Sequence, residues 1–404
     1  MQKLIGGVIL VAATTIGSGM LSLPMVLAKL GLLPSICLMI FIWLVMYHSA
    51  LVNVELNLNS GRGTPLSTLA RKISGKNAEL ISAVSFKALS YSLLAVFIYA
   101  GSSVLQKLIL NYANIEYSFI TVATFYTFCS ALILLLPLKI IDYANRVLFI
   151  GLLVVIFIFV LVIAAFVKIE SVNALVFQTN ISDIRAWEIV LPVVFTSFGF
   201  QVIFHTLTDY CEKNPVTLEK AFFYGSLIPT FVYIVWTIST IAVIHSHNPI
   251  FYEQIIHGKV EVGEVIKELG KISKWEFLEL VSWLISSLAI VTSVIGVGLG
   301  LTQTISNMIE PKVSHSYGRK VLGVFGSLIP AYFIAIKVPN AFIAVLGFAG
   351  MILTVIAILM PIYLFYKAKI SNLHYKILSC NTLNIMSVFV AVIIIICKIS
   401  DMVN

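Results

Sequence analysis

The chain is poor in charged residues, and this excludes a soluble protein of its length. Only 11% of its 404 residues are Asp, Glu, Lys or Arg, whereas 60% are hydrophobic. In soluble domains about a quarter of the residues are charged and about half are apolar. The composition therefore predicts one polytopic membrane unit, although the length alone would allow two or three soluble domains.

Cysteine is also scarce. The five cysteines are scattered, mostly inside apolar segments, and none forms a CxxC pair. They indicate neither a disulfide framework nor a metal site. His245 and His247 lie close together in the sequence, but two ligands without a third do not make a zinc site. We expect no metal and no cofactor.

Apolar stretches near or above 20 residues can cross a bilayer as helices. The sequence has eleven, approximately over 4–28, 33–57, 78–108, 118–137, 146–167, 187–210, 219–244, 275–306, 321–337, 341–366 and 381–397. The sequence therefore predicts an all-α integral membrane protein, with residues 1–404 forming a single transmembrane domain.

The net charge of +8 does not indicate nucleic-acid binding, because the basic residues stand singly between apolar runs. The connections after even-numbered spans carry fourteen Lys and Arg residues and those after odd-numbered spans carry nine. Basic connections stay in the cytoplasm. We therefore expect the N-terminus in the cytoplasm and the C-terminus outside, with the chain in the plasma membrane.

The centre of the first span, from Ala12 to Pro24, contains residues that a plain membrane helix would not need. It reads Ala-Ala-Thr-Thr-Ile-Gly-Ser-Gly-Met-Leu-Ser-Leu-Pro, with Gly17 and Gly19 on either side of Ser18. Glycine readily leaves helical dihedral angles. Unwound backbone at this depth must be buried in protein or line a wet cavity, so the segment suggests a discontinuous helix that binds a ligand. A close helix crossing through small residues is the alternative.

The sixth span carries a second interruption. Pro192 to Gln201 reads Pro-Val-Val-Phe-Thr-Ser-Phe-Gly-Phe-Gln, which places hydroxyls, a glycine and a glutamine in mid-span. Interrupted spans at matching positions of two halves indicate an inverted-repeat transporter with its site at the membrane midplane. We expect a 5+5 inverted repeat with broken helices one and six. Repeat one covers about 4–167, repeat two about 187–366, and one extra C-terminal helix about 381–397.

These two segments resemble those of the bacterial aromatic amino acid permeases, the tyrosine and tryptophan permease family. That family shows a pattern close to Ala-Gly-Thr-Thr-Ile-Gly-Ala-Gly-Met-Leu-Ala-x-Pro in span one and Phe-Thr-Ser-Phe-Gly-Phe-His-Gly in span six. The chain departs from it at Ala13, Ser18 and Ser22, and at Gln201-Val202, which stand where the family has His-Gly. The resemblance implies a leucine-transporter type of fold within the amino acid–polyamine–organocation superfamily, with uptake driven by a proton gradient.

An amino acid presents a carboxylate and an ammonium, and two broken helices can bind both. The backbone N–H groups of Gly17, Ser18 and Gly19 lie at the start of a half-helix, whose positive dipole end suits a carboxylate. Carbonyl groups near Thr14 and Thr15 suit an ammonium.

The sixth span adds further groups of both kinds. We expect the Phe195 carbonyl and the Thr196 and Ser197 hydroxyls to contact the ammonium. Phe198 and Phe200, adjacent to Gly199, offer aromatic faces to a planar side chain, although a phenylalanine in a span is more often packing. Gln201 is a hydrogen-bond partner for a phenol or an indole N–H. A substrate carboxylate is the expected partner of Tyr91 in span three, with simple packing as the alternative.

Four further residues are candidates for coupling or gating. Thr292 and Ser293 stand where sodium-coupled relatives of the fold hold a cation, and the alternative is interhelical hydrogen bonding. Glu55 and Lys87 fall inside spans on the cytoplasmic side. Charged residues in spans are functional candidates by default, so we expect an ion pair that opens and closes with the inner gate; snorkelling of both side chains is the alternative.

The sequence thus predicts a secondary active transporter that imports aromatic amino acids by proton symport. Its expected partners are the amino acid, protons and the lipid bilayer, without nucleic acid. We expect tyrosine or tryptophan to be favoured over phenylalanine because of Gln201. Other neutral amino acids, such as serine, threonine or branched aliphatics, are the alternative substrates.

Two other classes fit less well. A membrane-embedded serine hydrolase would need a glycine at Ile16 and a histidine placed to activate Ser18, so no catalytic residue is expected. An ion channel would need a repeated filter sequence or a ring of like charges.

Overall fold

The computed structural model describes residues 2–17, 19–60, 63–164, 172–173, 175–176, 180–200, 203–272, 276–309, 316–338, 341–370 and 372–403. These residues form helices joined by short connections, and no strand occurs among them. The first half contains α1 (Gln2–Thr15), α2 (Gly19–Leu27), α3 (Leu32–Asn59), α4 (Leu66–Ser74), α5 (Lys76–Ala113), α6 (Phe119–Leu135) and α7 (Leu138–Ala164).

The second half begins with the helices α9 (Ile184–Ser197), α10 (Phe204–Tyr210), α11 (Pro215–His247), α12 (Pro249–Ile256), α13 (Val262–Ile272) and α14 (Glu276–Ile309). It continues with α15 (Ser316–Lys337), α16 (Ala341–Thr354), the π-helical turn η2 (Val355–Leu359), α17 (Met360–Ala368), the 3₁₀ turn η3 (Lys376–Ser379) and α18 (Asn381–Val403).

Within the described ranges, eight helical segments are long and apolar enough to cross a membrane. They lie in α3, α5, α7, α11, α14, α15, the continuous run from α16 to α17, and α18. A ninth is formed by α1 and α2 together, which are bent by 56° at the break between them. This confirms the expectation of an all-helical, multi-pass membrane protein.

Two of the eleven expected spans do not reach that standard. The 17-residue helix α6 covers most of 118–137 but is short for a span. The expected span over 187–210 is divided between α9 and α10. The count of eleven crossings, the single domain and the division into two five-span repeats stay predictions.

Several helices begin at side chains that cap their first turn. Asp183 accepts a hydrogen bond from the Arg185 N–H at the start of α9, at 3.0 Å. Asn214 accepts one from the Thr217 N–H at the start of α11, at 2.9 Å. Such caps satisfy N–H groups that have no partner inside the helix. Pro215 follows at the first position of α11, where the absence of an N–H has no cost.

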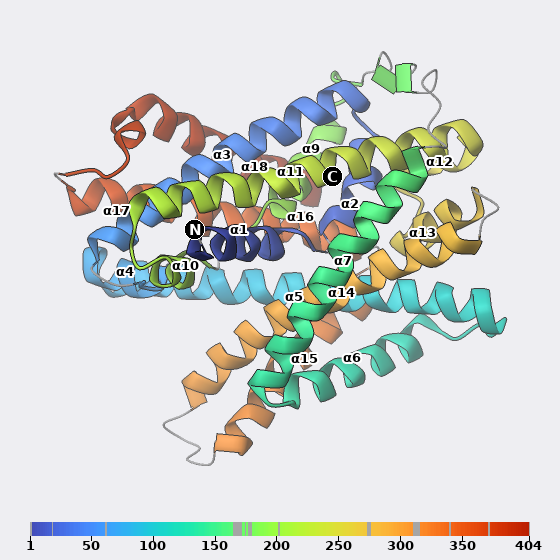
Figure 1. The fold of residues 1–404 in the computed structure, drawn as a ribbon, viewed down its shortest axis with the longest axis horizontal. Helices are drawn as coiled ribbons and strands as arrows, with labels where there is room; N and C mark the ends of the chain where they lie inside the picture. Colours follow the sequence, from blue (N-terminus) through green and yellow to red (C-terminus); the bar gives the residue numbers. More distant parts are fainter. Residues whose placement is uncertain are drawn as a thin grey trace.

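The long helices α3, α5 and α11 run lengthwise through the molecule (Figure 1). α4, α10 and α17 lie at one end, whereas α12 and α13 lie at the other (Figure 1). The connections expected in the cytoplasm after spans two, six and ten are therefore at one end. The long connection after span seven, which is expected outside, is at the opposite end.

The two interrupted segments lie in the interior of this bundle. α1 packs along α11, α2 packs against α9, and α16 packs against both α5 and α9. The approach is close: a Cβ atom on Gly225 would lie 2.6 Å from the Val11 Cβ atom. On Gly350 it would lie 2.5 Å from the Thr196 hydroxyl oxygen. Glycine at these two crossings lets the half-helices α1 and α9 approach their neighbours.

Candidate functional site: two helix breaks joined by Tyr233

The first break separates α1 from α2. The hydroxyls of Thr14 and Thr15 donate to the carbonyls of Leu10 and Val11, both at 2.8 Å, so each stays with its own helix. After Thr15 the helix stops, and the Met20 N–H donates to the Gly17 carbonyl at 3.1 Å. The structure thus bears out a discontinuous first helix at the expected residues.

The second break follows α9. The N–H groups of Phe198 and Gly199 donate to the carbonyls of Phe195 and Thr196, at 3.3 and 3.0 Å, in place of a further α-helical turn. The chain then runs through Phe200 to α10. Helices commonly end by such pairing of carbonyls within the last turn. The Phe195 carbonyl, which was expected to bind the ammonium, therefore already accepts a hydrogen bond from the backbone.

The two breaks meet at Gly19 and Ser197. The Ser197 hydroxyl lies 3.0 Å from the Val193 carbonyl of its own helix and 3.2 Å from the Gly19 carbonyl. A Cβ atom on Gly19 would lie only 3.2 Å from the Ser197 Cα atom. The start of α2 therefore approaches the end of α9 backbone to backbone.

A residue that the sequence analysis missed connects the same two helix ends. Tyr233 lies on α11 and is fully buried. Its hydroxyl is 2.6 Å from the Thr15 carbonyl and 2.9 Å from the Ser197 carbonyl, and donates to both. A hydroxyl has one proton, so the two carbonyls share it. The signal in the sequence was a tyrosine near the centre of an apolar span, because a buried tyrosine hydroxyl needs a partner.

The candidate cation residues lie on α14, one of them against the first break. A Cβ atom on Gly17 would lie 2.5 Å from the Ser293 hydroxyl oxygen. The Ser293 hydroxyl donates to the Ala289 carbonyl at 2.7 Å, and the Thr292 hydroxyl to the Leu288 carbonyl at 2.9 Å. The fold thus brings Ser293 to Gly17, as a cation site between these helices would require.

Thr196 is engaged in holding α9 to α16. Its hydroxyl lies 2.8 Å from the Pro192 carbonyl and 2.9 Å from the Leu346 carbonyl. Because this hydroxyl is already paired on both sides, its contribution in this conformation is to fix the end of α9.

The two phenylalanines of the second break are both fully buried but have different neighbours. Phe198 meets the ring of Tyr233 edge to face, with the ring centres 5.3 Å apart. Phe200 packs with Phe204 and Phe222 at 6.1 and 5.9 Å. Only Phe198 therefore lies beside the carbonyls of the two breaks, whereas Phe200 belongs to a cluster between α10 and α11.

Tyr91 is held elsewhere. Its hydroxyl donates to the Gly326 carbonyl on α15 at 2.9 Å, and this joins α5 to α15. Ser18 and Gln201, both expected in the pocket, lie outside the described residues.

The expected ion pair between Glu55 and Lys87 is not formed in this structure, and its opening and closing with the inner gate stays a prediction. Glu55 is fully buried, and its carboxylate accepts from the backbone N–H groups of His374 and Tyr375 at 3.1 to 3.2 Å and from the His374 ring at 3.0 Å. The carboxylate thus anchors the connection between α17 and α18. Sequence reasoning missed this because a carboxylate can be satisfied by backbone N–H groups as well as by a cation.

The anchored connection also reaches α11. The Tyr375 hydroxyl donates to the Pro215 carbonyl at 2.8 Å. Burial raises the pKa of Tyr375 above its ordinary value, and the nearby Glu219 and Glu55 carboxylates add to the effect. Tyr375 therefore stays a neutral donor, and the connection holds the end of α3 and the start of α11 together.

The comparison with known families decides the identity of this arrangement. The model of the tryptophan/tyrosine permease family matches residues 1–398. The chain belongs to that family. The match covers both helix breaks and Tyr233, and it confirms the resemblance seen in the two interrupted segments.

Individual relatives of this permease are distant but cover nearly its whole length. The tyrosine-specific transport system 1 of Haemophilus influenzae is 28% identical, over 98% of this chain and 96% of its own. The tryptophan-specific transport protein of Pseudomonas aeruginosa is 25% identical, over 89% and 85%. The glutamine transporter 2 of Aliivibrio fischeri is 26% identical, over 89% and 88%.

Proposed function

We propose that this permease imports aromatic amino acids, tyrosine or tryptophan above all, across the bacterial inner membrane. The observation that carries the proposal is the meeting of two helix breaks, in a member of the tryptophan/tyrosine permease family, at one buried tyrosine hydroxyl. Relatives named for tyrosine and tryptophan transport support the substrate class. The relative named a glutamine transporter supports a second candidate, a neutral amide substrate.

The two breaks suit the two charges of an amino acid. The Thr15 and Ser197 carbonyls each accept from the Tyr233 hydroxyl, and because a carbonyl oxygen has two lone pairs, each can accept a second hydrogen bond from a substrate ammonium. The N–H groups at the start of the nine-residue helix α2, with Gly19 first, form its positive end, where a carboxylate is favoured. Phe198 beside Tyr233 supplies an aromatic face.

We propose that transport uses alternating access, and contacts at both ends of the bundle support this proposal. At one end Lys3 pairs with Glu212, and Gly6 faces the Tyr210 hydroxyl, so that α1 lies against the end of α10. At the other end Lys29, after α2, donates to the Ile256 carbonyl of α12. Burial lowers the pKa of Lys29, and Asp183 opposes that shift. We propose that these contacts break alternately as the two five-span repeats move.

We expect uptake to be driven by protons. Labelled tyrosine should accumulate in proteoliposomes under an imposed inward proton gradient, and a protonophore should abolish the accumulation. Replacing sodium by choline should leave the rate unchanged, because the Thr292 and Ser293 hydroxyls have no carboxylate expected beside them. A strict sodium requirement would contradict proton coupling and would make these two residues cation ligands.

The proposed orientation has the N-terminus in the cytoplasm and the C-terminus outside. In a chain without its native cysteines, Lys72→Cys on α4 and Val403→Cys at the end of α18 should react with a membrane-impermeant maleimide from opposite sides. Val403 is 81% exposed, so accessibility does not limit its labelling. Reaction of both from the same side would contradict the eleven-span topology.

A further inference from the structure

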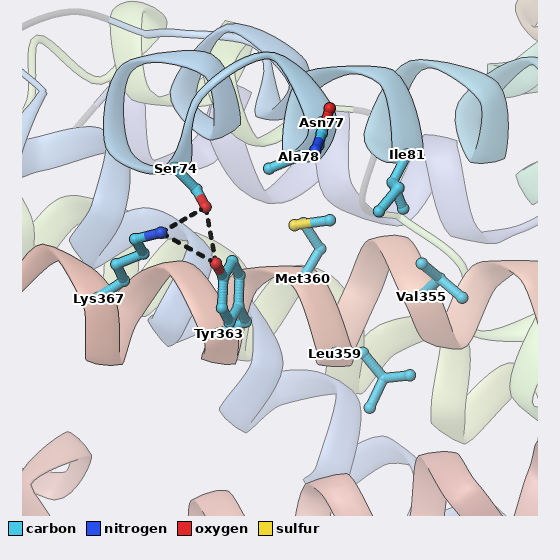
Figure 2. A pocket seen from close by; sticks show the side chains of 9 residues that line it. All are labelled: Ser74, Asn77, Ala78, Ile81, Val355, Leu359, Met360, Tyr363 and Lys367. Atoms are coloured by element: carbon cyan, nitrogen blue, oxygen red, sulfur yellow. Dashed lines mark hydrogen bonds between the residues drawn. The ribbon is translucent and has the colours of Figure 1, made fainter.

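A groove of about 470 Å³ lies between the junction of α4 and α5 on one side and η2 with α17 on the other (Figure 2). Its residues belong to none of the four half-helices that form the breaks, so it is separate from the transport site. Polar side chains lie at one end of the groove and apolar ones along the rest, and the two parts face the same space (Figure 2).

The polar end is built from Ser74, Tyr363 and Lys367. The Ser74 and Tyr363 hydroxyls are 2.7 Å apart, and the Lys367 ammonium donates to them at 2.9 and 3.2 Å (Figure 2). The ammonium also lies 5.5 Å from the centre of the Tyr363 ring. All of these partners are neutral. In the described part of the chain no carboxylate lies within ion-pair distance of Lys367, so its charge is held in place without being neutralised.

The apolar part is open to lipid. It is lined by Ile81 of α5 and by Val355 and Leu359 of η2. Ile81 is 51% exposed, and its neighbours Leu80 and Val84 on the same helix are more than half exposed as well. In a membrane protein such a surface contacts acyl chains.

The turn η2, which forms one wall of the groove, is held by hydrogen bonds from α3. The Ser49 hydroxyl and the Asn53 amide, both on α3, donate to the Ala357 carbonyl inside this turn. A π-helical turn widens the helix and often marks a functional position. Because the turn is anchored to α3, Val355 and Leu359 are presented to the groove by a rigid element.

The groove lies where the helices leave the membrane, and basic residues lie near it. Tyr363 and Lys367 stand in the last turns of the apolar segment Phe342–Ala368, and tyrosine and lysine are typical of that depth. The adjoining helix α4 is amphipathic and carries Arg71 and Lys72 in its last turn. Lys76 follows at the start of α5, and Glu79 is paired with Arg71.

We propose that this groove binds one anionic phospholipid. The lipid phosphate accepts a charge-assisted hydrogen bond from the Lys367 ammonium and further hydrogen bonds from the Tyr363 and Ser74 hydroxyls. An acyl chain of the same lipid lies along Ile81, Val355 and Leu359. A basic pocket between membrane helices is a recognised form of headgroup site. The apolar wall favours a lipid over free phosphate, because free phosphate has no apolar part to contact it.

The test uses the full chain in vesicles that contain phosphatidylglycerol with a photoreactive group in its acyl chain. Crosslinks should map to residues 77–81 and 355–360. Lys367→Ala should reduce them about tenfold, because the hydrogen bond between the ammonium and the phosphate is lost, and Lys367→Arg should retain them. The matched control is Lys369→Asn. It removes a cation of the same helix end outside the groove, at a left-handed position (φ 47°) that asparagine tolerates, and it should leave the crosslinks unchanged.

Three results would overturn the proposal. One is equal crosslinking by a phosphatidylcholine analogue, which would show that the headgroup charge is not recognised. The second is loss of the crosslinks with excess inorganic phosphate, which would show a site for free anions. The third is unchanged crosslinking in a Lys367→Ala protein that keeps the wild-type melting temperature and elution profile.

Discussion

Gly17→Ala is expected to abolish most of the transport activity without unfolding the protein. The added Cβ atom would lie 2.5 Å from the Ser293 hydroxyl oxygen, far inside normal contact distance. The Ser293 hydroxyl can turn away from the new methyl group only by giving up its hydrogen bond to the Ala289 carbonyl, which costs about 0.5–1.5 kcal/mol and corresponds to a loss of the correct arrangement of up to about tenfold. Because the overlap is confined to the break, the loss should appear in the rate of tyrosine uptake, with little change in the amount of folded protein.

A second substitution separates a steric cause from a chemical one. In a Gly17→Ala, Ser293→Ala protein the nearest remaining Ser293 atom, its Cβ, is 3.8 Å from the new methyl group, so the overlap disappears. We expect uptake to recover to the level of Ser293→Ala alone. Near-normal uptake by Gly17→Ala, or no recovery in the double variant, would contradict the close approach of this break to α14.

Tyr233→Phe is also expected to reduce transport, for a different reason. It keeps the ring that Phe198 packs against and removes only the hydroxyl that the Thr15 and Ser197 carbonyls share. Leaving a buried acceptor unpaired costs about 1–3 kcal/mol, so we expect tyrosine uptake to fall about 5- to 150-fold. The two helix ends should lose their fixed separation.

The control for this substitution lies on the same helix. Tyr224→Phe removes a hydroxyl from a side chain that is 49% exposed on α11, and uptake should stay within the experimental error. Both proteins should show the same elution profile and melting temperature. Wild-type uptake by a folded Tyr233→Phe protein would show that the hydroxyl does not position the breaks.

Local composition was sufficient to locate the elements of this site but not their partners. Gly17, Gly19 and Gly199 indicated where the first and sixth spans break, because glycine inside an apolar helix signals a departure from helical geometry. The apolar runs likewise predicted the ranges of the long helices.

The pairing of distant side chains was not accessible in the same way. Tyr233 is separated from Thr15 by 218 positions, and no spacing rule connects them. Glu55 shows the same limit: the charge predicted a cation as its partner, whereas the fold supplies the backbone of His374 and Tyr375. Hydrogen-bond partners depend on which helices pack together, and one sequence does not state this.

Competition for tyrosine uptake tests the central claim most directly. Purified protein in proteoliposomes takes up labelled tyrosine in the presence of excess of each common amino acid in turn. Tryptophan, tyrosine and phenylalanine should compete. Lysine, arginine, aspartate and glutamate should not, because an extra side-chain charge near the midplane costs about 2.5–3.5 kcal/mol or more. Strongest competition by glutamine, a branched aliphatic or a basic amino acid would contradict an aromatic amino acid permease.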